Sequence, residues 1–170
     1  KLYYMIGLPG ETVKDIEYIA ELSKRITDLG YGSRSVHLNV NPFVPKPQTS
    51  FQWEGMPSVS YVRDSINFLR RLLRGDKRLL ISCLDPRHAR VQAFLSLGDR
   101  KIGNVIEMVA RYGGGLGSWR RALRESKVSM DGYIKGKTIG GPLPWDHVDV
   151  GLNKGLLIRE AENARKMTDV

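Results

Sequence analysis

The stretch YYMIGLPGET, residues 3–12, decides the fold, because an apolar strand breaks there into a turn that leads straight into a helix. Its glycines permit backbone conformations that other residues resist, and its proline stiffens the turn. Thr12 and Asp15 form the capping-box pattern TVKD, after which apolar residues recur at three-to-four spacing as far as Gly30. The stretch therefore predicts a strand over residues 1–7 and an amphipathic helix behind it.

A second strand is predicted in SRSVHLNVNPF, residues 33–43, where apolar and polar side chains alternate. Strand, helix and strand joined by short connections form a βαβ unit, so the two strands are expected to be parallel. The covering helices take the apolar face, which carries Val36, Leu38 and Val40. The opposite face carries His37, Asn39 and Asn41. It is expected to line a polar cavity, or to meet solvent if this strand lies at an edge.

The rest of the chain reads as a buried third strand and a series of helices. The third strand is RLLISCL, residues 78–84. Helices are expected over 58–74, 86–98, 100–112, 118–126 and 153–167, and residues 131–151 read as irregular. This order predicts an α/β fold with a βαβ-containing half, residues 1–84, and a mainly helical half, residues 85–170.

The composition favours anionic partners, because 27 Lys and Arg against 18 Asp and Glu give a net charge of +9. RNA is one candidate, although the sequence contains no recognisable RNA-binding motif. No segment approaches the ~18–20 consecutive apolar residues of a membrane span, so no membrane partner is expected. The single cysteine, Cys83, excludes an internal disulfide and favours a cytoplasmic protein. Its apolar surroundings predict a core position.

The strongest candidate binding site lies where the first two strands end. GLPGET follows the first strand and NPFVPKPQT the second, and parallel strands place their carboxyl ends at one edge of the sheet. The two turns suit a flat heteroaromatic group such as adenine, with Ile6 and Phe43 on its faces and the backbone near Val44 at its rim. Glu11 and Lys46 would then meet the charged parts of the ligand. GLPGET is neither a P-loop nor a Rossmann fingerprint, and a plain tight turn is the equal alternative.

Two further segments carry side chains that could take part in catalysis or in ligand binding. In PWDHVD, residues 144–149, the candidates for acid–base groups or weak metal ligands are Asp146, His147 and Asp149. A structural hydrogen bond is the alternative for them. The basic stretch 74–104 is a candidate for contact with a phosphate group or an RNA backbone, and helix capping with ion pairing is its alternative.

Taken together, these segments resemble the radical S-adenosylmethionine (SAM) superfamily. IGLPGET, followed about 30 residues later by FVPKPQT, is similar to the fifth and sixth strands of that barrel. FVPKPQTSFQWEGM, LSLGDRKIGNVIE and PLPWDHVDVGLNKGLLIRE resemble landmarks of an iron–sulfur subgroup that often carries an upstream cobalamin-type domain. The resemblance implies the C-terminal portion of a partial TIM-like (β/α)6 barrel with a helical extension. It also implies a parent enzyme in which a [4Fe–4S] cluster cleaves SAM to a 5′-deoxyadenosyl radical, with cobalamin as an open candidate.

Residue by residue, the resemblance implies adenosyl contacts from Ile6, Gly7, Pro9, Gly10, Glu11, Phe43 and Val44. The candidates for the substrate side are His37, Asn39, Asn41, Asp146 and His147. The cluster motif CxxxCxxC does not occur in the sequence, so no metal ligand and no catalytic residue is assigned. Because the chain starts at Lys1 inside a strand, we expect a piece of a longer protein, inactive without the N-terminal half of the barrel and its cluster.

Two other function classes stay open. The chain would be a basic RNA-binding module, or a non-enzymatic interaction domain in which GLPGET is only a turn. A half barrel would also leave the edge of the first strand unpaired, and unpaired edges recruit partners. This reasoning predicts a homodimer or a strand-swapped assembly.

Overall fold

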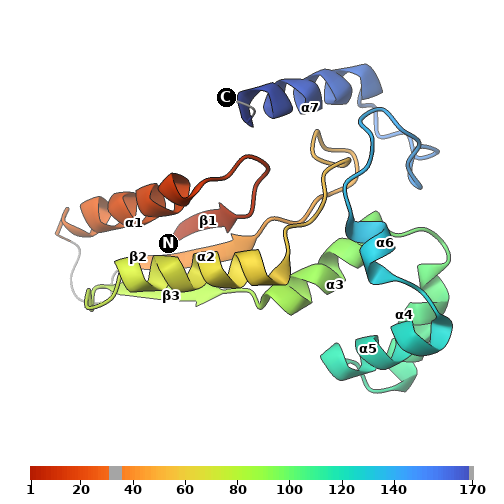
Figure 1. Cartoon of the computed structure of the whole chain (residues 1–170), viewed down its shortest axis with the longest axis horizontal. Coiled ribbons are helices and arrows are strands. Elements are labelled where there is room, and N and C mark those ends of the chain that lie inside the picture. The colour runs from red at the N-terminus through yellow and green to blue at the C-terminus, as the bar shows by residue number, and fades with distance from the viewer. Residues whose placement is uncertain (31–35, 169–170) are drawn as a thin grey trace. The chain divides into compact units, whose positions relative to one another are not determined.

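The computed structural model describes residues 1–30 and 36–168 (Figure 1). Residues 31–35, which include the start of the second predicted strand stretch, lie outside the described part. The chain divides into two compact units. The first contains residues 1–43 and 57–86, and the second contains residues 44–56 and 87–170. The loop 44–56 thus belongs with the second unit.

The first unit is built on a parallel three-stranded sheet in the order β1-β2-β3. The strands are β1 (Leu2–Ile6), β2 (Val36–Pro42) and β3 (Leu79–Cys83). The predicted parallel βαβ unit is therefore confirmed, and so is the α/β class. Because β2 lies between the other two strands, the alternative that made it an edge strand is wrong.

Two helices, α1 (Val13–Thr27) and α2 (Val59–Leu72), run alongside this sheet (Figure 1). Both pack on the face predicted to be covered, and the shared core contains Ile16, Ala20, Val36, Leu38, Val40, Val62, Ile66 and Leu69. The predicted capping box starts α1, because the Asp15 carboxylate accepts hydrogen bonds of 2.7 Å from both the backbone N–H and the hydroxyl of Thr12. Ser58 begins α2 by accepting from the N–H of Tyr61.

The third strand differs from its prediction. It was expected to be buried, but its side chains alternate, with Leu79 in the core and Leu80 45% exposed. In the described part of the chain β3 pairs only with β2, so it is an edge strand covered on one face. Cys83 is accordingly half-buried and not a fully enclosed core residue.

The second unit is mainly helical. Its elements are α3 (Pro86–Leu97), α4 (Ile102–Arg111), α5 (Gly115–Ser126), α6 (Met130–Ile134) and α7 (Lys154–Thr168). The short helix α6 lies in the segment that was expected to be irregular, and the Ser129 hydroxyl caps it by accepting from the N–H of Gly132. One apolar cluster is centred on Phe94, and a second is centred on the fully buried Trp53.

The loop 44–56 is fixed to the second unit by backbone hydrogen bonds. The N–H of Met56 donates to the carbonyl of Ile134 at 2.9 Å, and the N–H of Lys137 donates to the carbonyl of Trp53 at 2.7 Å. No helix in residues 1–30 and 36–168 is both long enough and apolar enough to cross a membrane.

Candidate functional site

The GLPGET turn is closed by its own glutamate. The N–H of Gly7 donates to both carboxylate oxygens of Glu11 at 2.9 Å, and the hydroxyl of Tyr61 on α2 donates to Glu11 Oε1 at 2.8 Å. The N–H of Glu11 in turn donates to the carbonyl of Leu8 at 3.0 Å. These bonds join the turn to a helix 50 residues away in the sequence and hold it in one conformation.

A glycine is required at position 7 for two reasons. Its φ of +89° lies in the region that side chains rarely adopt. A Cβ placed there would also lie 2.5 Å from Cγ of Pro57. The bare backbone of Gly7 therefore lets the chain approach the proline ring that precedes α2. Gly10 has a φ of +77°, which also favours glycine at that position of the turn.

Glu11 lies in an environment that disfavours its charge. Burial raises the pKa of Glu11, and the hydrogen bonds from Tyr61 and Gly7 offset only part of this effect. Burial and the hydrogen bond to Glu11 raise the pKa of Tyr61 to about 12. Tyr61 therefore keeps its proton over the whole neutral range and can donate it to Glu11 in the hydrogen bond.

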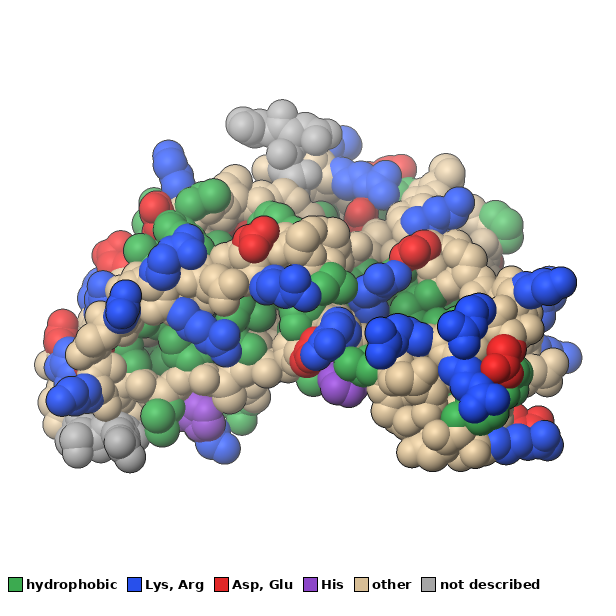
Figure 2. All heavy atoms as spheres, turned by 60° about the horizontal axis from the view of Figure 1, so that its bottom comes forward, with side chains coloured by type: hydrophobic (Ala, Val, Ile, Leu, Met, Phe, Trp, Pro, Cys, Tyr) green, Lys and Arg blue, Asp and Glu red, His purple; other side chains and the backbone are tan. Residues whose placement is uncertain are grey.

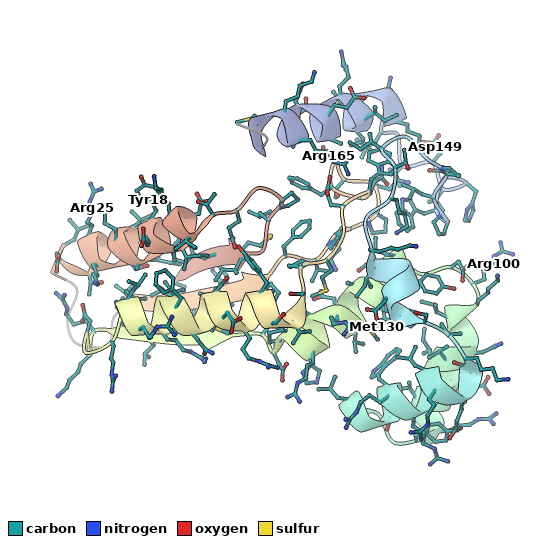
Figure 3. The ribbon with its side chains drawn as sticks, in the orientation of Figure 1. Tyr18, Arg25, Arg100, Met130, Asp149 and Arg165 are labelled. Carbon is teal, nitrogen blue, oxygen red and sulfur yellow. The ribbon has the colours of Figure 1, made fainter. Side chains whose placement is uncertain are left out.

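A cavity of about 360 Å³ opens beside the turn. The residues that line it are Leu8, Pro9, Gly10 and Glu11 of the turn, Asp15 and Ile19 of α1, and Tyr4 and Met5 of β1. This volume lies in the range of small-molecule sites. Hydrogen bonds from the N–H and hydroxyl of Thr12 lower the pKa of Asp15, so this carboxylate is charged at neutral pH. The cavity can thus accept a ligand with hydroxyl or ammonium donors. On the far side of α1, Tyr18 and Arg25 point away from the sheet (Figure 3).

The two strand ends meet at the same edge, as the parallel arrangement requires. The N–H of Phe43 donates to the carbonyl of Ile6 at 2.7 Å, which extends the β1–β2 ladder past the strands. The side chain of Ile6 is fully buried and that of Phe43 is 3% exposed. In this structure a ligand at the edge would meet their backbone and not the faces of their side chains. Val44 packs against the Phe94 cluster of the second unit.

The three polar residues of β2 lie on the uncovered face but do not form one site. Asn41 lies opposite Met5, near the GLPGET turn, whereas His37 lies at the other end of the strand, opposite Leu80. The His37 imidazole is bonded to the hydroxyl of Ser82 at 3.0 Å. Among the three, only Asn41 therefore lies at the carboxyl end of the sheet, where parallel sheets bind ligands.

In the second unit, Asp146 has a structural role. It accepts hydrogen bonds from Lys154 Nζ at 2.7 Å and from the N–H of Leu143 at 3.0 Å, and these contacts lower the pKa of Asp146. His147 is exposed. The lysine proposed for a charged ligand group, Lys46, donates instead to the hydroxyl of Ser96 at 2.9 Å, and burial lowers the pKa of Lys46.

Gln52 was not among the functional residues predicted from the sequence. This side chain is 2% exposed, and its Oε1 accepts from Trp145 Nε1 at 2.7 Å and from the N–H of Gln48 at 3.1 Å. Both glutamines line a cavity of about 170 Å³ together with Asp146, Lys154 and Asp149. The one available signal was the position of Gln52 next to Trp53 in an apolar loop, where a polar side chain needs a partner.

The other titratable side chains of the described residues do not form a cluster that could hold a metal ion. In the described part of the chain, no group of three or more His, Cys, Asp or Glu side chains is placed to hold a metal ion. Burial raises the pKa of Cys83, and the nearby guanidinium of Arg70 only partly opposes this shift. Cys83 is thus a weakly nucleophilic thiol at neutral pH.

Comparison with known proteins adds one relative. The chain is 36% identical over 107 residues to the uncharacterized protein MJ0966 of Methanocaldococcus jannaschii. The match covers 63% of this chain and 23% of that protein, so the chain spans less than a quarter of its relative's length. No family model matches the chain. No solved structure matches it.

Proposed function

We propose that this chain is the distal part of a radical SAM iron–sulfur enzyme. In this proposal β1 and β2 are the fifth and sixth strands of a partial TIM-like barrel, and the helical unit is an extension on the substrate side. The resemblance of GLPGET and FVPKPQT carries the family assignment. The match to a much longer protein agrees with a larger parent.

One structural observation carries the binding role. The GLPGET turn is held by Glu11, Tyr61 and Pro57 at the carboxyl end of β1, next to the end of β2 and beside a cavity of about 360 Å³. Parallel strands with helices on one face and an uncovered second face are also the arrangement of a barrel segment, whose inner face would carry His37, Asn39 and Asn41.

The residues present fit part of the cofactor set. Glu11 and Asp15 are among the residues that line the cavity, and their carboxylates would serve as acceptors for the hydroxyl groups of an adenosyl ligand. An iron–sulfur cluster does not fit this chain, because a cluster needs several thiolates and the sequence has only Cys83. SAM and the cluster would supply the radical chemistry in the parent protein, and this chain would bind and orient the adenosyl group. Alone it would be inactive.

Titration of the chain with S-adenosylhomocysteine, followed by the backbone amide signals, tests the proposed site. We expect shifts at Gly10 and Glu11, weaker binding for Glu11→Gln, and unchanged binding for the control Glu17→Gln on the exposed side of α1. The parent protein should release 5′-deoxyadenosine from SAM under anaerobic reducing conditions. Absence of both the shifts and this product would favour the interaction-domain alternative.

A further inference from the structure

The segment that contains α4 and α5 carries an excess of exposed positive charge. Residues 98–128 contain seven Lys and Arg against three Asp and Glu. All three acidic side chains are already engaged: Glu107 pairs with Arg111, Glu125 pairs with Arg121, and Asp99 accepts from Tyr133 and from the N–H of Lys101. Each of these three carboxylates therefore already accepts a hydrogen bond or forms an ion pair within the second unit.

Five cationic side chains of this segment form no salt bridge in the described part of the chain: Arg100, Lys101, Arg120, Arg124 and Lys127. Arg120, Arg124 and Lys127 follow one another at spacings of four and three, so they lie on one side of α5 and its C-terminal cap. All of them are exposed, and Arg100 projects away from the ribbon (Figure 3). Lys and Arg crowd the right-hand part of the view in Figure 2, where α4 and α5 lie.

Two exposed glycines lie inside the helices, and Gly117 lies one turn before Arg120 on α5. Gly103 in α4 and Gly117 in α5 lack a positive φ, and a Cβ added to either would have no described atom within 4 Å. Glycine is the poorest helix former apart from proline, so the fold itself gains nothing from it at these positions. By contrast, the positive φ values of Gly113, Gly114 and Gly115 explain the glycines of the turn between the helices. The bare backbone at Gly103 and Gly117 fits a partner that lies against the helices.

We propose that this face of α4–α5, with Arg120, Arg124 and Lys127 at its centre, binds the phosphodiester backbone of a nucleic acid. Arginine favours this partner because its planar guanidinium matches phosphate oxygens in a two-pronged contact. Tyr112, at the end of α4, already has the Arg121 guanidinium over one face of its ring, 4.1 Å from the centroid, so that face is not free for base stacking. Binding therefore depends on phosphate contacts and not on base sequence. The inference does not rest on the proposed SAM site.

The salt dependence of binding tests the proposal with the complete chain. Fluorescence anisotropy would follow the binding of a labelled 20-nucleotide single-stranded RNA between 50 and 200 mM salt. Duplex RNA and duplex DNA of the same sequence would be titrated separately, to identify which kind of nucleic acid binds most tightly. Each phosphate contact contributes about 0.7 to the log–log salt slope for single strands. The triple variant Arg120→Gln/Arg124→Gln/Lys127→Gln should therefore lower the slope by about 2 and weaken binding at every salt concentration.

The matched control is Lys14→Gln/Arg63→Gln/Arg159→Gln, which removes two arginines and one lysine from exposed positions in α1, α2 and α7. It should leave the slope nearly unchanged. Equal losses in both triple variants would overturn the proposal, because binding would then follow net charge alone. Equal competition by polyglutamate would also overturn it, in favour of an acidic protein partner.

A separate variant tests whether the bare backbone at Gly117 contributes to binding. Gly117→Ala should raise the melting temperature or leave it unchanged, because alanine favours the helix, and it should weaken RNA binding because the added methyl group keeps the strand at a distance. A folded Gly117→Ala chain that binds RNA as tightly as wild type would contradict the close approach at α5.

Discussion

Replacing Gly7 by alanine should destabilise the first unit through two separable effects. The backbone effect comes from the φ of +89°, which costs a non-glycine residue about 1–2 kcal/mol. The packing effect comes from a Cβ only 2.5 Å from Cγ and 2.9 Å from Cβ of Pro57. Because a proline ring cannot rotate out of the way, we expect an overpacking cost of about 1–3 kcal/mol. Gly7→Ala should thus lower the free energy of unfolding by about 2–5 kcal/mol.

The chain offers a matched control. Gly75 has a similar φ of +94° and no atom within 4 Å of an added Cβ, so Gly75→Ala should show the backbone effect alone. All three tryptophans, Trp53, Trp119 and Trp145, belong to the second unit, and their fluorescence would miss this change. Urea-dependent amide hydrogen exchange of β2 reports on the first unit directly. If Gly7→Ala costs no more than Gly75→Ala, the argument from Pro57 fails.

Three further predictions concern Glu11, Trp145 and Cys83. Because the pKa of Glu11 is raised by burial, the folded state holds its proton more tightly than the unfolded state, so this group's contribution to stability is lost as pH rises from the ordinary value of 4.5 through the raised value. Thermal unfolding at several pH values should therefore show a flatter profile for Glu11→Gln, and parallel profiles would contradict the burial argument. Trp145→Phe removes the 2.7 Å hydrogen bond to Gln52 and should cost about 1–3 kcal/mol in urea unfolding, more than the control Trp119→Phe, for which the described structure shows no hydrogen bond. Cys83 should react with a disulfide reagent at pH 8 more slowly than a free thiol, because burial raises the pKa of Cys83, and urea should remove the difference.

Local patterns identified most elements of the fold. The alternation in VHLNVN and the TVKD capping box depend on neighbours along the chain, and both appear as predicted in β2 and at the start of α1. The apolar run RLLISCL indicated a strand but could not show that it lies at an edge. A continuous apolar run is typical of a strand covered on both faces, so the exposure of Leu80 could not be inferred from it, and only the neighbouring elements decide the burial of β3.

The candidate site was only partly predictable for a related reason. The sequence indicated that GLPGET and the end of the next strand share an edge, because parallel strands dictate this. It gave no sign that Tyr61 bonds to Glu11 or that Pro57 lies against Gly7, since each pair is separated by 50 residues in the chain. The contact between Gln52 and Trp145 spans 93 residues and was missed for the same reason.

The sequence by itself determined the βαβ order, the parallel strands, the turn that needs glycine and the excess of positive charge. These properties follow from residue type and from spacing over a few residues, which fix backbone conformation and the side of an element that is apolar. The tertiary structure alone decided that Glu11 is held by Tyr61 and that the acids of the α4–α5 hairpin are engaged while five cationic side chains are free of salt bridges in the described chain. Burial and pairing depend on which distant segments pack together, and the free energy of that packing is a property of the whole fold.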